Sequence, residues 1–331
     1  MPQLLIVTSE SDVHADFLIK ELSTTKSIIE PVRLNTESFI QKSQYYWAWD
    51  ALGNVYNQSL FFQDSLREAK EIKVIWWRKP EIYYPYPEVE DEWAVKYSED
   101  ETKSLIFSLP GLYPNAKWVN NYYNLRLPSQ RINQIPIAKQ LGILVPPTLV
   151  TNCYEPALDF LKHYGNCIIK PMNYSGFLHK DKQYGCYTHT LDIETLNVLR
   201  ESIHLAPVFL QKRIPKKAEY RVTLIGDKSF VCRIESKHLD DLDVALDWRI
   251  TEPERLIHVP DTLPDFYLSK LHQMLKILGL HFGAFDVICD DNDELYLIEL
   301  NPNGQWYWIE ALTGMPMAKA MVELIEKLAS L

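Results

Sequence analysis

The sequence FGAFDVICDDNDELYLIELNPNGQW, residues 282–306, carries the clearest structural signal in this chain. Apolar and β-branched residues alternate through residues 284–289 and 295–300 on either side of a short polar run, which predicts a β-hairpin. With a period of two, Asp286 and Glu299 each fall within a strand made for burial. A buried carboxylate is costly without a cation. The hairpin therefore predicts a cation beside these two residues.

Three oxygen-bearing side chains of this hairpin can share one face. Glu299 and Asn301 lie two residues apart on the second strand, and antiparallel pairing can bring Asp286 to the same side. Ligands that are all oxygens suit a hard ion such as Mg²⁺, whose shell is often completed by substrate phosphates. This interpretation predicts a phosphate-bearing substrate. The alternative is that both carboxylates are ordinary strand residues in salt bridges with basic neighbours.

Length, composition and charge narrow the class of protein. A chain of 331 residues is long for one compact domain and suits two or three lobes. The formal net charge of -10 argues against a nucleic-acid binder that works by bulk electrostatics. Five cysteines without a CxxC pair are expected to be reduced core residues. No signal peptide or membrane-spanning apolar run is evident, so a cytoplasmic protein is expected.

The chain before this hairpin is expected to form further lobes. A strand, a helix and a strand within residues 4–34 predict a small α/β lobe over residues 1–120. Its first turn, residues 9–12, lacks glycine, so the phosphate cradle of a dinucleotide fold is missing. A central lobe over residues 121–210 and a C-terminal lobe over residues 211–331 are expected to follow.

The run WWR at residues 76–78 has two interpretations. Aromatic residues and arginine dominate binding hot spots, so Trp76, Trp77 and Arg78 could form a docking surface for a partner peptide. The alternative is that the tryptophans close the core of the first lobe.

Cations occur at the ends of predicted elements. Lys170 ends a buried strand, and a cation at that position suggests that it binds an anion. The alternative is that the long aliphatic side chain simply carries the ammonium group to solvent. Arg131, on the first turn of a helix over residues 129–141, can point into an adjacent cleft. Arg221 and Arg249 lie on opposite sides of a second hairpin and its continuation. The polar loop 172–189 could cover phosphates as a mobile lid.

These features form a recognisable series. The strand lysine before a flexible loop, the extended linker at residues 211–214, an EYRV strand, FDV and a closing ELNPNG occur in this order. Together they resemble the ATP-grasp carboxylate ligases over residues 120–331. WWRKP, VPPTLVTN, DWR and NPNGQWYWIE further resemble the ligases that macrocyclise ribosomal peptides of the microviridin (graspetide) type. The resemblance implies an α/β ATP-grasp fold that binds ATP between its central and C-terminal lobes. A small N-terminal pre-ATP-grasp lobe precedes these two lobes in the sequence.

The resemblance also implies roles for single residues. Lys170 and Arg131 match the groups that grip the ATP phosphates, although the family usually has lysine at the second position. Arg221 and Arg249 match cations near the transferred phosphate and the substrate carboxylate. Gln211, Lys212 and Ile214 match the family's adenine-binding residues, and Glu219 matches its ribose-binding residue. The magnesium ligands match Asp286, Glu299 and Asn301.

The implied reaction joins two groups of one peptide. The γ-phosphoryl of ATP is transferred to an Asp or Glu side chain of a precursor peptide, and a Ser, Thr or Lys side chain then attacks the acyl phosphate. The product is an ω-ester or ω-amide ring. One alternative is a ligase that adds a free amino acid to a small acid or a protein tail, and another is a non-catalytic nucleotide-binding module. Dimerisation is common in the resembled family, although no stretch of this sequence establishes a homodimer.

Overall fold

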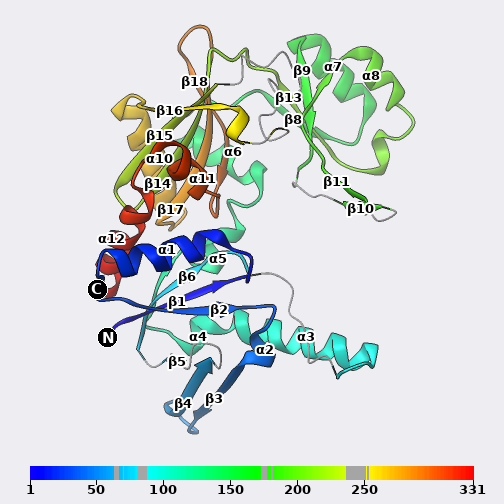
Figure 1. Ribbon diagram of the computed structural model, residues 1–331. Coiled ribbons are helices and arrows are strands. Elements are labelled where there is room, and N and C mark those ends of the chain that lie inside the picture. Colours follow the sequence, from blue (N-terminus) through cyan, green and yellow to red (C-terminus); the bar gives the residue numbers. More distant parts are fainter. Residues whose placement is uncertain are drawn as a thin grey trace.

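A computed structural model describes the chain except residues 63–66, 70, 81–87, 173–176, 180–181, 236–250 and 252. Arg249 lies outside the described residues, and the expected lid at residues 172–189 is described only in part. Figure 1 shows a parallel sheet at the bottom, a central sheet at the upper right and a larger C-terminal sheet at the upper left. No helix in the described part of the chain is both long and apolar enough to cross a bilayer.

The N-terminal part of the fold contains a four-stranded parallel sheet. Its elements are β1 (Gln3–Thr8), α1 (Val13–Thr24), β2 (Glu30–Asn35), α2 (Phe39–Lys42), β3 (Ser43–Trp49), β4 (Val55–Phe62), β5 (Arg67–Glu68), β6 (Ile72–Trp77), α3 (Glu92–Phe107), α4 (Leu109–Leu112), β7 (Lys117–Val119) and α5 (Tyr122–Arg126). The strand order is β2-β1-β6-β7. Every residue of β1 is buried, as is usual for parallel strands covered on both faces. Asp12 caps α1 by accepting a hydrogen bond from the backbone of His14, as aspartate commonly does at a helix N-terminus.

The tryptophans of β6 belong to the core. Trp76, Trp77 and Arg78 are at most 4% exposed. The two rings pack in different hydrophobic clusters, one on each side of the parallel sheet. The core interpretation of this run is therefore confirmed, and the docking-surface interpretation is wrong, because a buried side chain cannot meet a partner.

The central part of the fold is a small antiparallel sheet with helices. Its elements are α6 (Arg131–Gln140), β8 (Thr148–Thr151), α7 (Tyr154–Tyr164), β9 (Cys167–Lys170), β10 (Phe177–His179), β11 (Lys182–Tyr184), β12 (His189–Leu191), α8 (Ile193–Val198), a 3₁₀ turn (Ile203–Leu205) and β13 (Val208–Lys212). The central sheet has the order β12-β9-β13-β8. It packs with α7 and α8 in a hydrophobic cluster of its own. Helix α6 instead packs against the last strand of the C-terminal sheet.

The C-terminal part of the fold contains a five-stranded antiparallel sheet. Its elements are β14 (Ala218–Ile225), β15 (Lys228–Glu235), a 3₁₀ turn (Pro253–Arg255), β16 (Ile257–Asp261), α10 (Asp265–Ile277), β17 (Phe282–Cys289), β18 (Leu295–Asn301), α11 (Tyr307–Thr313) and α12 (Met317–Ala329). The strand order is β16-β15-β14-β17-β18. Both hairpins expected from the sequence are present, and Gly226 adopts a positive φ of 57° in the turn between β14 and β15.

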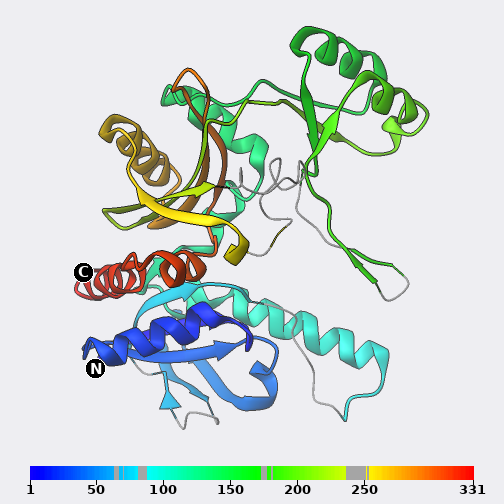
Figure 2. The same cartoon turned by 45° about the horizontal axis from the view of Figure 1, so that its top comes forward.

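The last helix joins the two larger sheets. In Figures 1 and 2, α12 lies beside α1 of the N-terminal part. Residues of α12 share one hydrophobic cluster with β1, α1 and the start of β17. The sequence predicts a last helix over residues 314–331, and α12 confirms it. Helix α11, which ends at Gly314 with a φ of 73°, was not predicted. The N-terminal and C-terminal sheets therefore share a core.

Asn120 connects the end of β7 to both strands of the β17–β18 hairpin. Its Nδ2 donates to the carbonyls of Phe282 and Pro302, both at 2.8 Å. Its Oδ1 accepts from the backbone N–H groups of His281 and Phe282 at 2.7 and 3.1 Å. One buried amide thereby satisfies four backbone groups, and it fixes the hairpin against the N-terminal part.

Candidate active site

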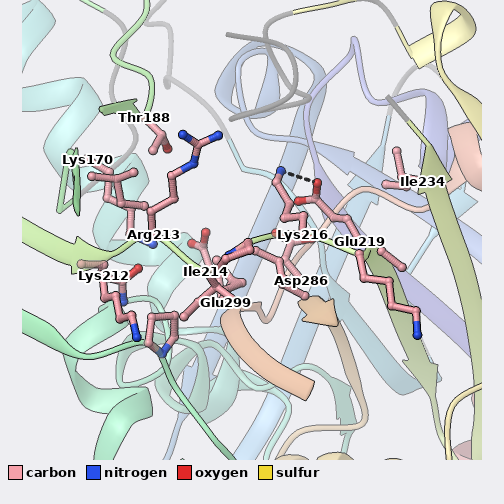
Figure 3. A pocket seen from close by; sticks show the side chains of 18 of the residues that line it. Lys170, Thr188, Lys212, Arg213, Ile214, Lys216, Glu219, Ile234, Asp286 and Glu299 are labelled. Carbon is pink, nitrogen blue, oxygen red and sulfur yellow. Dashed lines mark hydrogen bonds and ion pairs between the residues drawn. The ribbon is translucent and has the colours of Figure 1, made fainter. Parts of the chain in front are cut away.

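A cavity of about 670 Å³ opens between the central sheet and the C-terminal sheet (Figure 3). It is within the size range of small-molecule sites. The side chains that line it include seven cations and four carboxylates, namely Arg131, Lys170, Lys212, Arg213, Lys216, Lys217 and Arg233 against Glu219, Glu235, Asp286 and Glu299. The chain as a whole has a net charge of -10. A positive cavity in an acidic protein favours an anionic ligand.

Two carboxylates of the β17–β18 hairpin face this cavity together. Asp286 and Glu299 are cross-strand partners, so their side chains lie on the same face of the sheet. An irregularity in the register follows Asp286, where Ile298 has no partner on β17. Both carboxylates line the cavity that Lys170 also lines (Figure 3). The structure thus brings Asp286, Glu299 and Lys170 to the wall of one cavity.

Each of the two carboxylates is held by a buried arginine. Arg221 Nη1 lies 2.8 Å from Asp286 Oδ1, and Arg131 Nη2 lies 3.0 Å from Glu299 Oε2. The salt bridges of the alternative interpretation are therefore present, but they stand at a cavity wall. The second oxygen of each carboxylate accepts no hydrogen bond from the described residues. Each carboxylate thus keeps one oxygen available for a cation.

Asn301 continues the same strand face but sits at the edge of the site. It pairs with Ala284 across the hairpin, and its Oδ1 accepts from the backbone N–H of Asn303 at 3.2 Å. It is exposed and does not line the cavity. No three His, Cys, Asp or Glu side chains of the described residues are grouped so as to hold a metal. The hard oxygen donors present, two carboxylates and a nearby amide, fit Mg²⁺ better than a soft metal.

Arg131 and Lys170 place positive charge on the central side of the cavity. Lys170 ends β9, and its Nζ lies 5.3 Å from the centre of the Phe209 ring. Arg131 donates through Nη1 to the carbonyl of Pro171 at 2.5 Å while Nη2 contacts Glu299. Arg131 therefore bridges the central sheet and the C-terminal sheet directly.

The linker between β13 and β14 forms another wall of the cavity. The predicted nucleotide-binding residues Gln211, Lys212, Ile214 and Glu219 all line it. Gln211 donates to Thr148 Oγ1 at 2.9 Å, which orients its amide. Lys216 Nζ contacts Glu219 at 2.7 Å, the pair joined by the dashed line in Figure 3. The linker expected from the sequence therefore lines the cavity.

Three further cations of this linker were not predicted. Arg213, Lys216 and Lys217 also line the cavity. The basic run KRIPKK at residues 212–217 was the available signal. Extended chain around a proline leaves successive side chains on different sides, so the sequence alone does not show which of them turn inward.

The turn after β18 is held from both sides. Arg78 Nη1 donates to the carbonyl of Asn303 at 2.7 Å, and the Asn303 amide donates back to the carbonyl of Arg78. Burial lowers the pKa of His14, so the neutral ring accepts the Trp306 N–H through Nε2 at 3.1 Å. Burial alone would raise the pKa of Asp12, but hydrogen bonds from His14 and Thr8 and the charge of Arg78 hold that pKa well below its usual range. The N-terminal part thereby positions the turn that follows Asn301.

Gly304 fits this turn because it lacks a side chain. A Cβ at this position would lie 2.6 Å from Ala284 Cβ and 2.7 Å from Arg221 Nη2. The guanidinium of Arg221 also donates to the carbonyl of Gln305 at 3.3 Å. The turn therefore packs directly on the arginine that holds Asp286.

Gly304→Ala is expected to destabilise the protein by about 1–3 kcal/mol, because the added Cβ overpacks against Ala284 and Arg221. The thermal midpoint of unfolding measures this loss of stability. Gly111→Ala is the matched control, because no atom lies within 4 Å of the added Cβ. Equal thermal midpoints for the two variants would contradict this packing.

Comparison with known proteins places the fold. No family model matches the sequence, and no curated protein matches it. Among solved structures, a RiPP-associated ATP-grasp ligase of Chryseobacterium gregarium, in complex with ADP and a leader and core peptide, is 22% identical at a TM-score of 0.87, covering 98% of this chain and 96% of that one. The macrocyclase MdnC of Microcystis aeruginosa, bound with precursor peptide MdnA, is 22% identical at a TM-score of 0.82, covering 98% and 99%.

A more distant match has the same architecture. D-alanyl-alanine synthetase A of Vibrio cholerae is 11% identical at a TM-score of 0.61, covering 100% of this chain and 99% of that one. Identities this low establish the fold rather than the reaction. The agreement extends over nearly the whole length of each chain, and the cavity lies between the central and C-terminal sheets, as the resemblance implied. This chain has the ATP-grasp fold.

Proposed function

We propose that this protein is an ATP-dependent, ADP-forming ligase that macrocyclises a precursor peptide. The observation that carries the proposal is the single cavity that gathers Lys170, Arg131 and the Asp286–Glu299 pair. Cations on one wall and oxygen ligands on another suit a magnesium-bound triphosphate. Of two structures that are similar over their full length, one was solved with ADP and a leader and core peptide, and the other with a precursor peptide.

The proposed reaction overcomes the poor reactivity of a carboxylate. Transfer of the γ-phosphoryl group of ATP to an Asp or Glu side chain of the peptide forms an acyl phosphate and releases ADP. A Ser or Thr hydroxyl or a Lys amine then attacks the acyl carbon, forms the ester or amide bond and expels phosphate. Neither step needs a nucleophile from the protein, so catalysis rests on positioning and charge stabilisation.

The residues that line the cavity divide this work. Lys170 and Arg131 would bind the phosphates, and Arg221 would offset charge near the transferred group. The adenine and ribose would lie along the linker, against Gln211, Lys212, Ile214 and Glu219. Asp286, Glu299 and Asn301 would hold Mg²⁺, which when bound offsets negative charge on the phosphoryl group. In the protein alone, Arg131 and Arg221 balance the two carboxylates.

Incubation of the protein with Mg-ATP and candidate precursor peptides is expected to yield peptides that have lost one water for each ring formed. Mass spectrometry measures this loss, and hydroxylamine separates esters from amides because it cleaves only the esters. A reaction without ATP and one with a peptide whose Asp and Glu residues are replaced by Asn and Gln are the controls. A peptide that gains the mass of an amino acid would overturn the macrocyclase proposal.

The alternative reaction is ligation of a free amino acid. It is supported by the likeness to D-alanyl-alanine synthetase A, which has the same architecture at lower similarity. The two reactions differ in the direction of the mass change, so the same experiment distinguishes them. A non-catalytic nucleotide-binding module would instead bind ATP without releasing ADP under any of these conditions.

A further inference from the structure

The strand that carries Glu299 and Asn301 is an edge strand. β18 ends the order of the C-terminal sheet, so its outer backbone groups need partners from outside the sheet. The carbonyl of Leu144 accepts from the Leu297 N–H at 2.8 Å. Further along β18, the side chain of Gln134 forms hydrogen bonds with the outer backbone groups of Leu300. The outer edge of β18 is therefore covered by residues that lie far away in the chain.

Gln134 acts on Leu300 as a neighbouring strand would. Its Oε1 accepts from the Leu300 N–H at 2.7 Å, and its Nε2 donates to the Leu300 carbonyl at 2.8 Å. The same Nε2 donates to the carbonyl of Pro128 at 2.7 Å. Gln134 is only 5% exposed, so these bonds form in a medium where an unpaired partner is costly. The peptide groups on both sides of Leu300 are thereby fixed in orientation.

Leu300 separates two of the proposed magnesium ligands. Side chains alternate along a strand, so the orientation of the Leu300 backbone sets the direction in which Glu299 and Asn301 project. Arg131 lies one helical turn before Gln134 on α6 and holds the carboxylate of Glu299. One face of α6 therefore contacts both the side chain of Glu299 and the backbone beside it.

We propose that Gln134 is a positioning residue that sets the geometry of Glu299 and Asn301 for divalent-cation binding. It does not contact the cation or the substrate; it acts through the backbone of Leu300. This inference rests on the proposed function, because the cation site belongs to it. Partners that orient metal ligands commonly change metal affinity by about 10–100-fold when they are removed.

The test measures cation binding apart from turnover. Mn²⁺ is titrated into the complex with ADP, and free Mn²⁺ is followed by its electron paramagnetic resonance signal. Gln134→Leu is expected to weaken Mn²⁺ binding about tenfold, while the affinity for ADP measured in EDTA stays within about twofold of wild type. Gln134→Glu keeps the acceptor for the Leu300 N–H but loses both donors, so it is expected to be similarly weakened; it serves as the test if the leucine variant does not fold.

Asn133→Ala provides the matched control on the same helix. Asn133 is partly buried, and among the described residues its side chain donates only to the carbonyl of Leu127, so its removal is expected to leave Mn²⁺ affinity unchanged. A folded Gln134 variant that binds Mn²⁺ as tightly as wild type would overturn the inference and leave the proposed function standing. A wild-type protein that binds neither ADP nor Mn²⁺ with ADP would overturn the proposed function itself.

Discussion

Glu299→Gln is expected to lower the rate of ADP release roughly a thousandfold at saturating Mg-ATP and peptide. Glutamine keeps the size and one oxygen of the side chain but removes the negative charge. One of the two hairpin carboxylates that face the cavity is lost, and the cation of Arg131, which Glu299 balances at 3.0 Å, is left without its carboxylate partner. A coupled assay of ADP formation measures the loss.

Asp227→Asn serves as the control for this substitution. Asp227 lies in the turn between β14 and β15, and its ion pair with Lys327 at 2.7 Å is exposed to solvent. Exposed pairs contribute little, so this variant is expected to turn over like wild type. If Glu299→Gln melted at the wild-type temperature and retained more than about a tenth of the rate, the proposed role of Glu299 in catalysis would be wrong.

Lys170→Met is expected to lower turnover about a hundredfold and to raise the apparent KM for ATP. Methionine keeps most of the aliphatic stem beside Phe209 but removes the cation that lines the cavity. A cation that meets the phosphates stabilises both the bound nucleotide and the charge that develops during transfer. Initial rates at varied ATP concentration separate the two effects.

Lys228→Met is the matched change away from the site. Lys228 begins β15, and its exposed side chain pairs with Glu323 of α12. It is expected to leave both kinetic constants unchanged. Calorimetry with ADP gives a second measurement that does not depend on a peptide. Wild-type ADP affinity and wild-type turnover in Lys170→Met would show that Lys170 has no part in phosphate binding.

The strands that carry the candidate site were predictable because their side-chain pattern is local. The alternation around Asp286 and Glu299 predicts both the hairpin and the shared face, and the observed register places the two residues opposite each other. Lys170 at the end of β9 and the linker from Gln211 were likewise correctly placed. In each case the prediction needs only a few neighbouring residues, namely the alternation of side chains along a strand or a proline that ends the strand.

The contacts that orient the site were not predictable from the sequence. Gln134 and Leu300 are 166 positions apart, and Arg78 and Asn303 are 225 apart. Such bonds depend on how sheets and helices pack, which no local pattern describes. Helix α11 was not predicted for a related reason. Its aromatic residues define a buried face only when β16 and α12 pack against the helix.

The separate core of the central sheet has a consequence for the rate of the reaction. Two hydrophobic clusters join the N-terminal and C-terminal sheets, whereas the third contains buried residues from Ala157 to Leu210 only. A rigid-body movement of the central sheet would therefore leave both of the other cores intact. In the proposed reaction, ADP would leave by such a movement, and bond formation then need not be the slowest step of the catalytic cycle.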